Sequence, residues 1–129
     1  MCRMIISQSK AIGMEQACIL ISRLMISRDH EKGRVSINYY IKMLEKNHTK
    51  HIKNYGDRLE ERLTGRYETS SIDEFSAGDG NRGSSIRIPK PVAIKGYGYI
   101  EDRRPGANAD PYLVAALIIS SIAEIEFDA

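Results

Sequence analysis

Charged and aromatic side chains that could do chemistry gather in one short stretch of this sequence, Tyr97 to Pro105. If the stretch is extended, Tyr99, Glu101 and Arg103 share a face, because successive side chains of a strand point to opposite sides. A carboxylate in this setting suits a divalent metal bound to phosphates, and an arginine can hold a carboxylate or phosphate at two points. An exposed salt-bridge cluster without a ligand is the alternative interpretation.

A second strand is expected to lie beside this one. Residues 84–88 alternate polar and apolar side chains as a half-buried strand, with Arg87 on the face opposite the two isoleucines. A loop over residues 90–96 would join the two strands as an antiparallel pair. Several arginines would then surround Glu101, which is typical of a phosphate-handling pocket. These arginines are Arg82, Arg87 and Arg103.

Two short segments before the strands should shape the rim of such a pocket. Residues 62–68 place a turn at Thr64 and Gly65 between a cation and an anion, so this loop could close over a ligand. Residues 71–74 match a capping box, which predicts a single helical turn that ends near Gly78.

Helical periodicity appears in two places, and with the strands it indicates an α+β fold of helices on a small antiparallel sheet. Residues 36–55 have apolar side chains at spacings of three and four, with Gly56 placed as the C-terminal cap. We expect His48 and His51 to face solvent there, since lysines flank them. The second helix begins after Asp110 with a proline at its first position and is apolar nearly all round, which indicates burial on more than one side.

Length and charge limit the possible classes of protein. The chain has 129 residues and a net charge of +2, which suits one globular domain and gives no clustered basic surface for nucleic acid. Cys2 and Cys18 lack the spacing of a zinc site or a disulfide framework, so we expect a reducing, intracellular compartment. No run of eighteen apolar residues predicts a membrane span. A soluble, cytoplasmic protein is therefore expected.

The first 27 residues are harder to interpret. They carry Arg3, Lys10 and Arg23 against the single acid Glu15, a composition shared with mitochondrial transit peptides. The alternative is that residues 14–26 form a short apolar helix or strand with an unidentified packing partner.

Several separated blocks together resemble the C-terminal part of a eukaryotic-type glutamine synthetase, the glutamate–ammonia ligase. The resemblance extends from about Arg28 to Ala123, so we divide the chain into residues 1–27, which do not share it, and residues 28–129. The blocks follow the family's order with similar spacing: Arg62-Leu-Thr-Gly-Arg-Tyr-Glu68-Thr, Asn81-Arg82, Ser85-Ile-Arg87-Ile, Tyr99-Ile-Glu101-Asp-Arg103-Arg-Pro and Asn108-Ala-Asp-Pro.

The resemblance implies an ATP-dependent carbon–nitrogen ligase. Such an enzyme joins ammonia to L-glutamate through a γ-glutamyl phosphate intermediate and gives glutamine, ADP and phosphate. It implies ATP and Mg²⁺ or Mn²⁺ as cofactors, L-glutamate and ammonium as substrates, and assembly into a homo-oligomer. Nothing in it points to nucleic acid or a membrane.

The resemblance also implies roles for individual residues. Arg62 and Arg103 resemble the arginines that bind the carboxylate or the γ-phosphate of the substrate glutamate. Arg82 and Arg87 resemble those that stabilise the transferring phosphoryl group and bind the nucleotide phosphates, Arg82 being catalytic.

Three further residues have counterparts in the family. Glu101 resembles a ligand of the metal that bridges ATP and glutamate, and Tyr99 resembles a residue beside the nucleotide. Glu68 resembles the flap carboxylate, a catalytic group that shields the intermediate and takes a proton from ammonium.

The chain also departs from the family pattern. Tyr67 stands where a histidine is usual, Asp79-Gly80 replaces a small apolar pair, and Ile100 replaces an aromatic residue. The family's N-terminal β-grasp domain and most of its metal-binding glutamates have no counterpart in these residues. We therefore expect this chain by itself to be inactive and its helix over residues 113–125 to be poorly covered. The alternative is a non-catalytic fragment that binds nucleotide or associates with full-length subunits.

Overall fold

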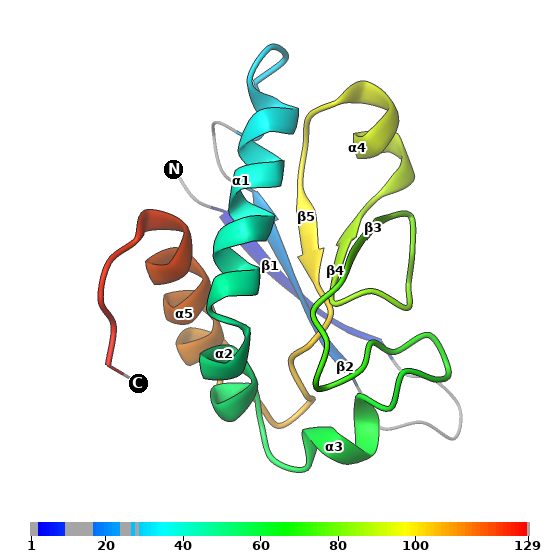
Figure 1. Cartoon of the computed structure of the whole chain (residues 1–129), viewed down its shortest axis with the longest axis vertical. Helices are drawn as coiled ribbons and strands as arrows, with labels where there is room; N and C mark the ends of the chain where they lie inside the picture. Colours follow the sequence, from blue (N-terminus) through cyan, green and yellow to red (C-terminus); the bar gives the residue numbers. More distant parts are fainter. Residues whose placement is uncertain (1–2, 10–16, 24–26, 28, 129) are drawn as a thin grey trace.

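The fold is a mixed five-stranded sheet with helices packed against it, which confirms the α+β class (Figure 1). The computed structural model describes residues 3–9, 17–23, 27 and 29–128, the first two segments as backbone only. Sheet order is β1-β2-β5-β4-β3, and neighbours are antiparallel except β3 and β4, which run parallel. The strands are β1 (Arg3–Ser9), β2 (Ala17–Arg23), β3 (Ala77–Asp79), β4 (Ile86–Ile88) and β5 (Ile100–Asp102).

The predicted pair of strands around Glu101 is present. In β4 and β5 the partners are Ile86 with Asp102 and Arg87 with Glu101. The connection between them is the helix α4 (Lys90–Lys95), so the predicted loop is wrong. Prolines at the N-cap and in the first turn favour the start of a helix, because the first N–H groups of a helix have no partner inside it.

The helical turn predicted from the capping box is also wrong. Ser71 instead forms an isolated antiparallel bridge with Thr64, so its backbone is extended, and its hydroxyl accepts a hydrogen bond from the Asp73 N–H at 3.3 Å. The chain then enters β3. The Ser76 and Ser85 N–H groups each donate to the other serine's hydroxyl, at 3.2 and 3.1 Å, which ties the start of β3 to β4.

The helix predicted over residues 36–55 is two helices, α1 (Gly33–Lys46) and α2 (His48–Asn54). They meet at Asn47, whose side chain donates to the Met43 carbonyl at 2.9 Å and satisfies an acceptor of the last turn. Gly56 follows α2 with φ +114°, which fits its expected place beyond the helix end. The one-turn helix α3 (Leu59–Arg62) comes next.

The last helix, α5 (Pro111–Ala123), begins as predicted, because Asp110 accepts hydrogen bonds from the Tyr112 and Leu113 N–H groups. Figure 1 shows α5 beside α1 and α2, which cross in front of the sheet. Leu117 and Ile118 are 0% and 1% exposed, so the expectation of poor cover is wrong for them. They share one core with the side chains of α1 and the sheet, which include Ile37, Leu44, Ile86, Ile88 and Ile100.

The N-terminal segment adds two strands to this sheet. The backbone of β2 pairs with β1 on one side and β5 on the other, with Ile21 opposite Glu101. Residues 17–23 are therefore a strand, one of the two forms expected for them, and the division of the chain at residue 27 stays a prediction. Among the helices of the described residues, none has the length and apolar character needed to cross a membrane.

Candidate functional site

The site begins with the alternation of side chains along β5. Glu101 faces Arg87 of β4, whose Nη1 lies 3.1 and 3.0 Å from the two carboxylate oxygens. The Arg103 Nη1 lies 3.8 Å from the same carboxylate. These side chains are only 21%, 11% and 16% exposed for Arg87, Glu101 and Arg103, so this is a half-buried group and not an open surface cluster.

Arg103 links this group to the turn before β4. Its Nε donates to the Arg82 carbonyl at 3.0 Å, and burial lowers its pKa while the Glu101 carboxylate opposes that shift. The Arg82 Nη1 lies 3.9 Å from the Glu68 carboxylate, and both of these side chains are exposed. The expected residues thus lie together: Arg87, Glu101 and Arg103 are in direct contact, and Arg82 joins them through its backbone.

Glu68 stands on a tight loop. The loop is closed where the Gly65 N–H donates to the Ser70 carbonyl at 3.2 Å. Tyr67 and Glu68 both have positive φ, 54° and 59°, a conformation that is unfavourable for residues with a side chain and is kept only where the surroundings enforce it. The loop therefore holds Glu68 toward Arg82 at a cost in backbone energy.

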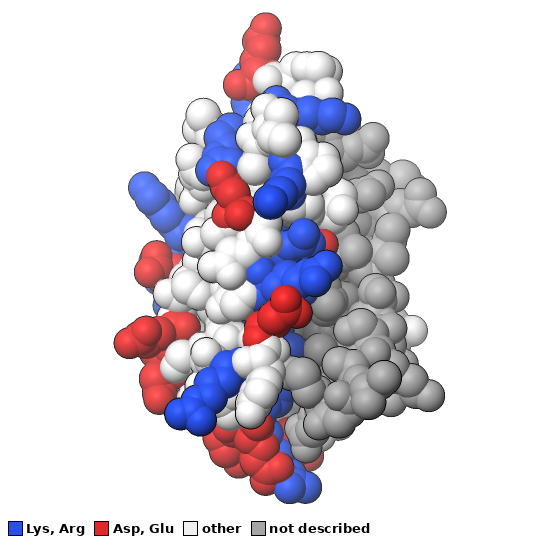
Figure 2. Space-filling view, turned by 90° about the vertical axis from the view of Figure 1, so that its right-hand side faces the viewer, with Lys and Arg blue, Asp and Glu red and all other residues white. Residues whose placement is uncertain are grey.

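The face in Figure 2, the right-hand side of Figure 1, shows the surface on the β3 and α4 side of the molecule. Basic side chains lie there with acidic side chains between them. Charges of both signs are thus close together on this face, and their fields partly cancel.

Arg62 lies apart from that group. Its Nη1 and Nη2 donate to the carbonyl oxygens of Arg104 and Arg103 at 3.0 and 2.8 Å, so its guanidinium group binds the backbone just after β5. It also lines an open hollow of about 260 Å³ together with Asp57 and Asn108. Tyr99 is partly buried against the core.

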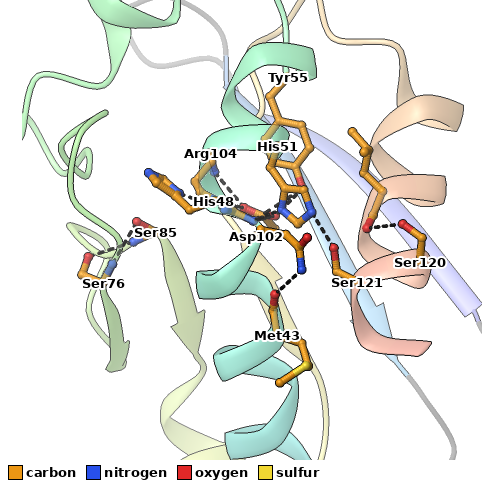
Figure 3. Close-up of polar contacts among 12 residues, drawn as sticks. Met43, His48, His51, Tyr55, Ser76, Ser85, Asp102, Arg104, Ser120 and Ser121 are labelled. Atoms are coloured by element: carbon orange, nitrogen blue, oxygen red, sulfur yellow. Dashed lines mark hydrogen bonds and ion pairs between the residues drawn. The ribbon is translucent and has the colours of Figure 1, made fainter. Parts of the chain in front are cut away.

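On its other face, β5 carries a buried polar cluster (Figure 3). Asp102 and Arg104 are paired there, with Nη2 2.7 Å from Oδ2, and the Tyr55 hydroxyl donates to Asp102 at 3.0 Å. Arg104 also donates to His48 and His51, at 3.1 and 2.9 Å.

The expectation that these two histidines face solvent is wrong. His51 is completely buried and stacks on Tyr55 with ring centroids 5.2 Å apart, and His48 is half-buried. The four-residue spacing from His51 to Tyr55 is the signal that could have indicated a shared helix face. The flanking lysines themselves are exposed, so they indicate solvent at their own positions and not at those of the histidines.

Electrostatics in this cluster follow from burial and from the arginine charge. Burial and the charge of Arg104 lower the pKa of His51 to about 4, and burial is the main cause of the lowered pKa of His48. Burial would raise the pKa of Asp102, but Arg104 outweighs it and the pKa is lowered. Burial, with Asp102 nearby, raises the pKa of Tyr55. The cluster therefore holds one ion pair and two neutral imidazoles at neutral pH.

The described residues do not by themselves form a metal centre. Among them, no group of three or more His, Cys, Asp or Glu side chains could hold a metal ion. Both oxygens of Glu101 already accept hydrogen bonds from Arg87. Glu101 can at most be one member of a larger set of oxygen ligands.

Comparison with known proteins connects the site to one family. No protein-family model matches the chain. Glutamine synthetase from Colletotrichum gloeosporioides is 53% identical to it over 92 residues, which are 71% of this chain and 26% of that protein. Glutamine synthetase from Saccharomyces cerevisiae and the chloroplastic one from Chlamydomonas reinhardtii are each 53% identical over 90 residues, 70% of this chain and 24% of theirs.

The chain thus spans about a quarter of the length of these curated relatives. The identity is far above what unrelated sequences share over 90 residues. The resemblance seen in the sequence is confirmed, and over some 70% of its length this chain is homologous to part of glutamine synthetase.

Proposed function

We propose that this chain supplies the arginine-rich part of a glutamine synthetase site, where ammonia is ligated to L-glutamate with ATP through γ-glutamyl phosphate. The observation that carries the proposal is the contact of Arg87, Glu101 and Arg103 in a segment that is homologous to those enzymes. The name of the relatives, glutamine synthetase, supports the reaction, and the half-buried charges support a ligand that carries phosphate.

Phosphoryl transfer depends mostly on positioning and on positive charge near the transferring group. Arg82 is exposed and can turn toward a phosphate, whereas Arg87 and Arg103 are held by Glu101 at the edge of the core. We assign Arg82 to the transferring phosphoryl group, Arg87 to the nucleotide phosphates and Arg103 to the γ-phosphate. Tyr99, two residues before Glu101, would lie on the nucleotide side.

Glu68 would receive the proton that ammonium loses before ammonia attacks. Its loop lies next to Arg82, so the same loop can shield the intermediate from water when a ligand draws Arg82 inward. For Arg62 we add a second role to the glutamate binding that the resemblance implies. Its guanidinium group donates to the carbonyls of Arg103 and Arg104 and so fixes the backbone position at the end of β5.

ATP with Mg²⁺ or Mn²⁺ would supply the phosphoryl group and the charge that balances its phosphates. Glu101 would give one carboxylate to the metal, and the further ligands would come from residues outside the described part or from another chain. The homo-oligomeric assembly that the resemblance implies, and the cytoplasmic or mitochondrial location expected from the composition, stay predictions.

Isothermal titration calorimetry of ATP with Mg²⁺ binding to residues 1–129 tests this proposal. We expect weak binding that Arg87→Met and Arg103→Met each reduce further. Arg58→Met is the matched control, because it removes the same charge from an exposed side chain that pairs with Glu61 outside the group. Equal losses in all three variants, or no binding by the unsubstituted chain, would overturn the nucleotide role.

The same purified chain can distinguish the proposed role from the alternative of a non-catalytic fragment. Binding of ATP without turnover would favour a non-catalytic nucleotide-binding chain. Co-elution with a full-length glutamine synthetase, measured by light scattering and without ATP binding, would favour subunit association.

A further inference from the structure

Arg104 is the best-connected side chain of the described core. Its guanidinium is 0% exposed and contacts Asp102 through Nε at 2.9 Å and Nη2 at 2.7 Å. Nη1 and Nη2 also donate to the Nδ1 atoms of His48 and His51, and the Tyr55 ring lies 5.1 Å from the guanidinium carbon (Figure 3). A buried arginine with this many directed contacts has essentially one orientation.

The chemistry of arginine fixes the state of both histidines. A guanidinium only donates, so each Nδ1 must accept and each ring must carry its proton on Nε2. His48 Nε2 then donates to the Ile72 carbonyl at 3.0 Å, and His51 Nε2 donates to the Ser121 hydroxyl at 2.8 Å. Arg104 is thereby connected through two neutral rings to α2, α5 and the segment before β3.

The four consecutive residues 101–104 contribute alternately to the candidate site and to the buried cluster. Asp102 and Arg104 are paired in the core, while Glu101 contacts both Arg87 and Arg103 on the other face. A strand that slips by one residue moves every side chain to the other face, so whatever fixes this register also fixes the site.

Stability alone does not explain a buried ion pair here, because apolar side chains of similar volume often stabilise as well or better. Hydrogen bonds differ from apolar contacts in that they are directional. We propose that Arg104 is a positioning residue, whose buried bonds to Asp102, His48 and His51 hold Glu101 and Arg103 in the contacts that they make with each other and with Arg87. Its effect on ligand binding rests on the proposed function, whereas its effect on the geometry of Arg103 does not.

The test uses residues 1–129 with Arg104→Lys, which keeps the charge but cannot span Asp102 and both histidines. Ile37→Ala is the matched control, since it opens the same core on α1 and removes no hydrogen bond. The first readout is hydrogen exchange of the Arg103 Nε–H, observed by NMR, because that proton is bonded to the Arg82 carbonyl. The second is affinity for ATP with Mg²⁺.

We expect Arg104→Lys to lose the protection of the Arg103 Nε–H and about tenfold or more in ATP affinity, as misplaced binding groups do. Ile37→Ala should lower the stability of the fold but keep the protection of the Arg103 Nε–H and the affinity for ATP. If the two variants behave alike in both readouts, the positioning role is overturned. If the unsubstituted chain binds no ATP but Arg104→Lys still loses the Arg103 protection selectively, the proposed function fails and the positioning role stands.

A second variant covers the case in which Arg104→Lys does not fold. His48→Ala removes one acceptor of Arg104 at a half-buried position and leaves the ion pair with Asp102. A partial loss of Arg103 Nε–H protection, larger than the loss in Ile37→Ala, is expected. Full protection in His48→Ala would contradict the coupling of the cluster to the site.

Discussion

Arg87 and Glu101 lie opposite each other on β4 and β5, and one nitrogen of the arginine contacts both oxygens of the glutamate, at 3.1 and 3.0 Å. Since both side chains are mostly buried, either one left without its partner would be a poorly solvated charge. The pair is therefore a structural element of the sheet as well as a candidate ligand site.

Glu101→Gln should lower the free energy of unfolding by about 2 kcal/mol, because it leaves Arg87 and Arg103 close together without the negative charge between them. Urea unfolding measures this, and a double-mutant cycle with Arg87→Met isolates the coupling. The exposed pair Arg58 and Glu61 is the control cycle, whose coupling should stay below about 1 kcal/mol. Equal coupling in the two cycles would show that burial of the Glu101 pair has no effect.

Acid should destabilise the fold through His51. Its pKa falls from 6.5 to about 4 on folding, so between these values the unfolded chain binds a proton that the folded chain does not. The contribution of neutral His51 to the free energy of unfolding is complete above pH 6.5. It is lost as the pH falls toward 4, by roughly 3 kcal/mol over that window. His48 shifts in the same direction and adds to the slope, while Asp102, whose pKa is lowered, stays ionised.

Urea midpoints measured from pH 7.5 to 4.5 check this expectation. His51→Gln can accept from Arg104 and donate to Ser121 without titrating, so this variant should show a flatter profile. His30→Gln, on the surface against Tyr97, is the control and should keep the slope that the cluster produces. A wild-type slope in His51→Gln would contradict the assignment.

Two substitutions on α5 distinguish its covered and open faces. Leu117→Ala should cost about 2–5 kcal/mol, because the side chain is 0% exposed and its removal leaves a cavity. Ile119→Ala on the same helix should cost less than about 1 kcal/mol, because that side chain is 44% exposed. Thermal unfolding measures both. A large cost at Ile119 would mean that a second copy or another protein covers this face in solution.

Local patterns in the sequence predicted the parts of the fold that depend on local rules. Alternation gave the pairing of β4 with β5 and the contact of Arg87 with Glu101, and Asp110 followed by proline gave the start of α5. The prolines around α4 were misleading, because the same residue ends a strand and begins a helix.

Apart from the spacing of His51 and Tyr55, the buried cluster could not be predicted, because its other partners are distant in sequence. His48 and His51 lie more than fifty residues before Arg104, and next to lysines they have the composition of a solvent-exposed face. Only the tertiary structure shows that the two histidines are buried as neutral hydrogen-bond partners of the Arg104–Asp102 ion pair.

The last prediction is that residues 1–129 by themselves do not make glutamine. Binding of ATP with its metals brings several negative charges into one site, and such metals need multiple oxygen ligands in fixed geometry. Glu101 offers one carboxylate, and no group of three potential ligands occurs among the described residues. A metal held so weakly would leave the γ-phosphate poorly placed for Arg82 and Arg103, and placement is most of phosphoryl-transfer catalysis.

The experiment supplies the purified chain with ATP, Mg²⁺ or Mn²⁺, glutamate and ammonium, and follows phosphate and glutamine with time. We expect no turnover above the rate without protein, even where ATP still binds. Arg58→Met serves as the matched charge control for any residual signal. Steady glutamine formation that Glu101→Ala and Arg103→Ala abolish, but Arg58→Met does not, would show that this chain assembles a complete site, with the remaining metal ligands supplied by residues outside the described part or by a second copy.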